Sequence, residues 1–285
     1  MRSSNPVFTR RGFSQGGQAG FNAGAQHQTG SPYAGSPQNP YAQPANPYAQ
    51  QQMGPDGTMM QPGAPARAGV MTIDSVVNRT AITLGTVIAT AAVAWIMDLP
   101  LGIGIVCALV GMGLALWQSF KREPSPPLIL AYAAVEGVFL GCISNAINQA
   151  VPGAAMQAVL GTMAVFAGVL FMYKQRIIRV NARFTKFVVA ASIGFVLLMA
   201  INLIVALIGG GDGLGLRSGG LGILFGVIGI VLGACFLALD FKMVEDGVAY
   251  GAPEKESWLA AFGLTLTLVW IYLEFLRLIA ILQGD

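Results

Sequence analysis

Seven apolar runs of membrane length dominate the sequence after its first seventy residues. Each is close to the ~20 residues that a helix needs to cross ~30 Å of hydrocarbon, and none alternates with period two as a membrane β-strand does. The sequence therefore predicts an all-α membrane protein, a bundle of seven transmembrane helices over residues 76–285. The main alternative is an even number of spans, with the last run turning back instead of crossing. The runs are 80–97, 101–120, 127–147, 154–173, 187–208, 221–241 and 258–282.

The composition agrees with a chain whose main partner is the lipid bilayer. Only 10% of the residues are charged, against about 25% in soluble domains, and the mean hydropathy is +0.63. We expect no nucleic-acid partner. The three cysteines lie inside apolar runs, which favours small hydrophobic residues at helix contacts over a disulfide or metal site; they are Cys107, Cys142 and Cys235.

Residues 1–75 form a different kind of segment, rich in Gly, Pro and Gln. Nine of the fifteen prolines lie in its first seventy residues, and Asp56 is the only acid there. Such a stretch buries too little apolar surface to offset the entropy lost on ordering, so we predict a disordered tail. The alternative is a Tyr/Pro-rich segment that docks on a protein partner.

Basic residues mark one side of the predicted bundle. They precede the first run, lie between runs 2 and 3 and between 6 and 7, and are densest between runs 4 and 5, from Lys174 to Lys186. In the loops of the opposite side, Arg217 is the only basic residue. The positive-inside rule then predicts a multi-pass plasma-membrane protein with a cytoplasmic N-terminus.

Three carboxylates lie inside the apolar runs: Glu136, Asp240 and Glu274. A carboxylate in hydrocarbon is costly, so it usually faces protein or a wet cavity and marks an ion or proton path. With a cytoplasmic N-terminus, the third and seventh runs cross outward and the sixth crosses inward. Glu136 then lies near the midplane of the membrane, Asp240 in its cytoplasmic third and Glu274 in its far third. Asp240 and Glu274 are then on the order of 20 Å apart at 1.5 Å per residue. If their faces converge, the three acids form a ladder along a pH-sensitive path for protons or Ca²⁺, with Asp240 a candidate Ca²⁺ contact.

Small residues predict which way Asp240 faces. Four glycines form a stripe on one face of the sixth run, where another helix can approach closely, and Asp240 follows the last of them by almost two turns. It therefore faces protein. The stripe consists of Gly222, Gly226, Gly229 and Gly233.

Each acid also has a purely structural interpretation. Glu274 can form a salt bridge with Arg277, three residues later. Asp240 can lie at the membrane interface near Lys242, and Glu136 can be protonated and bonded to a backbone carbonyl. An enzyme is not expected, because the only histidine, His27, is in the tail, and no cofactor is predicted.

Three segments resemble the Bax inhibitor family of membrane proteins. They are Leu239-Asp240-Phe241 at the end of the sixth run, the segment 131–141 in the third, and 272–277 in the last. The tail and the segment 252–258 are most similar to the actinobacterial branch. The resemblance implies a seven-helix fold around one central helix and, in some bacterial relatives, a pH-sensitive calcium leak.

In those relatives two aspartates on the last two helices share a proton and gate the path. Asp240 matches the first. If the family's last helix is aligned on Tyr272-Leu273-Glu274, the second aspartate falls at Glu274. If it is aligned on the following Leu276-Arg277, the second aspartate falls at Thr267 or Val269. The competing function is a non-conducting scaffold or regulatory protein that acts through its N-terminal tail.

Overall fold

Seven helices account for nearly all of the described chain. The computed structural model describes residues 69–209, 213–216 and 218–284, so residues 1–68 of the predicted disordered tail lie outside it. All seven helices of this part are long and apolar enough to cross a membrane, as predicted. α7 is one uninterrupted helix, so the alternative in which the last run turns back is wrong. The helices are α1 (Ile73–Ile96), α2 (Leu101–Phe120), α3 (Pro126–Ala150), α4 (Ala154–Lys174), α5 (Ala182–Gly209), α6 (Gly219–Ala249) and α7 (Glu256–Gly284).

Several helices extend beyond the apolar runs because polar residues cap or continue them. α1 begins before residue 80 because the Thr72 side chain accepts a hydrogen bond from the Ser75 amide at 3.1 Å, as an N-cap does. α6 continues eight residues past 241, where Lys242 pairs with Asp246 at 2.8 Å in an i,i+4 arrangement. Such pairs stabilise a helix that has left the hydrocarbon.

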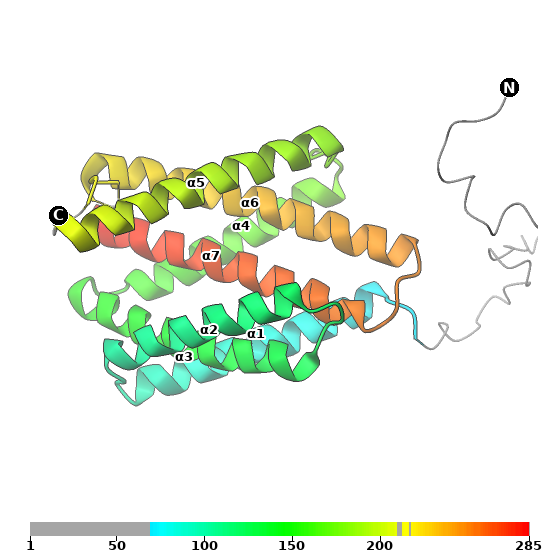
Figure 1. Ribbon diagram of the computed structural model, residues 1–285, viewed down its shortest axis with the longest axis horizontal. Helices are drawn as coiled ribbons and strands as arrows, with labels where there is room; N and C mark the ends of the chain where they lie inside the picture. Colours follow the sequence, from blue (N-terminus) through cyan, green and yellow to red (C-terminus); the bar gives the residue numbers. More distant parts are fainter. Residues whose placement is uncertain (1–68, 210–212, 217, 285) are drawn as a thin grey trace, which may run out of the picture. The chain divides into compact units, whose positions relative to one another are not determined.

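α7 is the central helix of the bundle (Figure 1). It contacts α1, α3, α4 and α6. α2 packs on α3, and α5 packs on α6, so both are peripheral. The burial pattern agrees, because α7 has buried residues from Ser257 to Ile279 along most of its length, whereas α5 exposes most of its apolar side chains to the surroundings. In a bilayer those side chains face lipid.

Glycines allow α3 to pack very closely on α1. A Cβ atom added at Gly137 would collide with Thr90 Oγ1 and with the Val87 carbonyl. One added at Gly141 would meet the Ala91 carbonyl and would lie 2.7 Å from the Ala94 side chain. This is the small-residue packing that membrane helices use where no hydrophobic force drives them together.

The connections gather at two ends of the bundle, in agreement with the alternating loop charges. At one end, the Met71 amide donates to the Ala252 carbonyl at 2.8 Å and the Glu254 amide to the Gly69 carbonyl at 2.7 Å. Lys255 pairs with Glu123 there at 3.1 Å. At the opposite end, Asn145 donates to Asp98 at 2.6 Å. The α6–α7 connection therefore joins the start of α1 and the α2–α3 loop.

Candidate functional site in the membrane-spanning helices

Asp240 lies between α6 and α7, facing protein. The hydroxyl of Thr267 donates to its Oδ2 at 2.6 Å. Its other oxygen lies 3.4 Å from where a Cβ of Gly263 would be, so α7 has no side chain there. Within the described residues, Asp240 forms no salt bridge. A carboxylate inside a membrane helix is thus held by one neutral hydrogen-bond donor.

Lys242 does not neutralise Asp240. Its ammonium group is 2.8 Å from Asp246 and 3.8 Å from Glu245, both toward the end of α6. Asp240 therefore has no ion pair with Lys242, and its position at the membrane interface stays a prediction.

The glycine stripe of α6 packs against α7. Gly226 faces Leu278, and Gly233 faces Ile271, whose Cγ1 would be 2.6 Å from an added Cβ. Gly229 faces Glu274, whose Cδ would be 2.9 Å away. Gly222 is buried as well. The close approach of the two helices is what brings Glu274 onto the α6 backbone.

Glu274 forms a local ion pair. Its Oε2 is 2.6 Å from Nη2 of Arg277, and the two side chains are 11% and 12% exposed. It is not a hydrogen-bonded partner of Asp240. Thr267 lies beside Asp240 and Gly229 lies beside Glu274, so the lengths of Thr267–Glu274 and Gly229–Asp240 measure the separation of the two acids. At 1.5 Å per residue these segments place the acids roughly 10 to 16 Å apart along the bundle, somewhat less than the predicted separation.

Glu136 lies at a different interface. It is 8% exposed and faces α2, where a Cβ on Gly111 would be 2.8 Å from its Oε2. Gly137 and Gly141 of α3 face α1 instead, so Glu136 lies on another face of α3. The contacts thus put Glu136 between α2 and α3, while Asp240 and Glu274 lie between α6 and α7. No contact brings the three together as one ladder in the described part of the chain.

Thr267 is the contact of Asp240 that a search for acids alone does not reveal. One of the two sequence alignments puts the second acid at Thr267 or Val269, and neither residue is charged. The sequence signal for Thr267 is its spacing: it lies on the same face of α7 as Ala260 and Gly263, one turn after Gly263. In the structure, the Thr267 hydroxyl is hydrogen-bonded to Asp240; which alignment places the second acid stays a prediction.

A small cavity lies between Asp240 and the α6–α7 connection. Its volume is about 160 Å³, and Met71, Met243 and Glu256 are among its lining residues. Met243 also lies near Gly263, beside Asp240. Among residues 69–209, 213–216 and 218–284, no group of three or more His, Cys, Asp or Glu side chains could hold a metal ion. A high-affinity cage of carboxylates is therefore not present in that part.

Comparison with known proteins agrees with this architecture. A search among curated proteins returned no match. The family described as Bax inhibitor 1 like matches residues 5–284, almost the whole sequence. The described chain has seven membrane-length helices with α7 at their centre and an acid in the glycine-rich α6, and the chain belongs to the Bax inhibitor 1 like family.

Proposed function

We propose that this protein is a pH-sensitive pathway for protons or Ca²⁺ across the plasma membrane, with Asp240 as its controlling carboxylate. The observation that carries the proposal is the environment of Asp240. It is inside a membrane-spanning helix, it accepts a hydrogen bond from Thr267 at 2.6 Å, and it has no salt-bridge partner among the described residues. Such a carboxylate either binds a proton or attracts a cation.

The other acids support a division of roles. Glu274 already has the charge of Arg277 beside it at 2.6 Å on the same helix, and its side chain packs against Gly229 of α6, so its role is structural. Glu136 is the second candidate for a proton-binding group, because it too has no salt bridge in the described chain. In this proposal Ca²⁺ is transported past Asp240 without being bound tightly, since one carboxylate and one hydroxyl make too few oxygen ligands for a tight site.

The small cavity supports an approach from one end. Asp240 is nine residues from the end of α6, or about 14 Å at 1.5 Å per residue. The cavity at Met71, Met243 and Glu256 occupies part of that length. We propose that this end is cytoplasmic, because the basic loops are there. The proposed role is transport and not catalysis.

The test is calcium and proton flux into liposomes that hold the purified full chain and a calcium or pH dye. We expect flux that depends on pH between about pH 5 and pH 8. Asp240→Asn removes the charge at nearly constant shape, so it should give the low-pH behaviour over that whole range. Glu274→Gln is the comparison and should change the profile less.

Two results would reject the proposal. Folded wild-type protein without flux at any pH favours the alternative, a non-conducting scaffold whose tail recruits a protein partner. A normal pH profile in Asp240→Asn together with a lost profile in Glu136→Gln moves the sensor to α3.

A further inference from the structure

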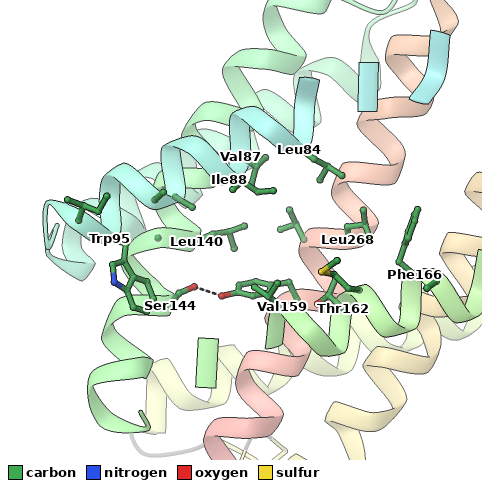
Figure 2. A pocket seen from close by; sticks show the side chains of 18 residues that line it. Leu84, Val87, Ile88, Trp95, Leu140, Ser144, Val159, Thr162, Phe166 and Leu268 are labelled. Carbon is green, nitrogen blue, oxygen red and sulfur yellow. Dashed lines mark hydrogen bonds between the residues drawn. The ribbon is translucent and has the colours of Figure 1, made fainter. Parts of the chain in front are cut away.

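A large apolar cavity opens between α1 and α4, away from Asp240. Its volume is about 680 Å³, which is within the 300–1,000 Å³ of ordinary ligand sites. α1, α3, α4 and α7 contribute its walls (Figure 2). α1 and α4 both contact α7 but not one another, so the cavity faces outward between them. In a membrane-spanning bundle that opening meets hydrocarbon.

The walls of this cavity are apolar along most of its length. The lining of α1 runs from Leu84 to Ile96, which is about 18 Å at 1.5 Å per residue. The hydroxyl of Thr162 is satisfied within its own helix, since it donates to the Ala158 carbonyl at 2.8 Å. The shape and chemistry suit an extended hydrocarbon chain.

One polar pair interrupts the apolar wall. The Ser144 and Tyr272 hydroxyls are 2.6 Å apart, and both line the cavity. Each hydroxyl carries one hydrogen, so their mutual bond uses only one of the two. In the described chain neither oxygen makes another hydrogen bond, and the remaining hydrogen is available to an acceptor. In an apolar cavity an unused donor is costly.

We propose that this cavity binds one acyl chain of a membrane glycerolipid. The chain lies between α1 and α4, and the ester carbonyl accepts a hydrogen bond from the Ser144–Tyr272 pair. Ser144 is six residues from the end of α3, or about 9 Å at 1.5 Å per residue. That depth is close enough to the membrane surface for a lipid ester group, and the chain then extends toward Leu84 and Phe166 (Figure 2).

The test is lipid retention by the full chain after purification in detergent, measured by native mass spectrometry. We expect one phosphatidylcholine per wild-type protein after the annular lipid is removed. Ala167→Phe fills the cavity from α4 and should lose that lipid. Val196→Phe is the matched control, because Val196 is 57% exposed on α5, and it should retain the lipid.

The role of the hydroxyl pair is tested with two ligands added to delipidated protein. The double variant Ser144→Ala/Tyr272→Phe should bind phosphatidylcholine about fivefold more weakly than wild type, as expected for one lost hydrogen bond. It should bind hexadecane, which has the chain but no carbonyl, as well as wild type does. Thermal melts establish that every variant is folded. Lipid-free wild type, retained lipid in folded Ala167→Phe, or an equal loss of both ligands in the double variant would overturn the proposal.

Discussion

At the scale of single residues, the hydrogen bond between Thr267 and Asp240 is the contact with the clearest chemical consequence. Thr267→Val keeps the shape and removes the donor, so the charged form of Asp240 loses stabilisation. We expect the midpoint of any pH-dependent flux to move up by roughly one pH unit. Thr265→Val is the control on the same helix, because Thr265 donates to the Ala261 carbonyl at 2.8 Å. A midpoint that moves equally in both variants would rule out a specific role for Thr267.

The ion pair of Glu274 and Arg277 gives a second prediction at this scale. Removing either partner breaks the 2.6 Å ion pair between two largely buried side chains, and breaking a buried pair is destabilising. Glu274→Gln and Arg277→Gln should therefore each lower the unfolding temperature, and the double variant should lose less than the sum of the two. The measurement is thermal unfolding in detergent. Additive losses would show that the two side chains act independently.

At the scale of helices, the α1–α3 contact depends on glycine. Gly137→Ala places a methyl group against the Val87 carbonyl, which is backbone and cannot rotate away. We expect a loss of about 1–3 kcal/mol, as for an overpacked core. Gly113→Ala on α2 is the matched control, because no atom lies within 4 Å of its added Cβ. Equal stability of the two variants in the same unfolding assay would contradict this packing.

The helices also show how far the sequence predicts the fold. Apolar run length predicted all seven spans, because a helix must cross a fixed thickness of hydrocarbon. It did not predict the ends, since Thr72 and the Lys242–Asp246 pair extend helices with polar residues. The glycine stripe predicted that Asp240 faces protein. It could not predict that Glu136 faces α2, because one helix face does not identify the neighbour that covers it.

At the scale of the whole molecule, the orientation in the membrane is a prediction that chemistry can test. Gln175 and Ala150 are exposed positions at opposite ends of the bundle. Each is replaced by cysteine in a variant whose three native cysteines are alanine. An impermeant thiol reagent should label position 175 only from the cytoplasmic side and position 150 only from outside. The reverse pattern would invert the topology and move the proposed entry to Asp240 to the outer face.

The pairing of residues 69–71 with 252–254 has a mechanical consequence. Its two backbone hydrogen bonds, at 2.7 and 2.8 Å, tie the start of the first helix to the connection that precedes α7. Met71 adds a side-chain anchor, since its sulfur lies 2.9 Å from the Cβ position of Gly247. Tension applied to the polypeptide ahead of Gly69 is therefore transmitted to the α6–α7 connection before it reaches the rest of α1. A pull on the residues ahead of α1 would therefore act on α6 and α7, the two helices that hold Asp240.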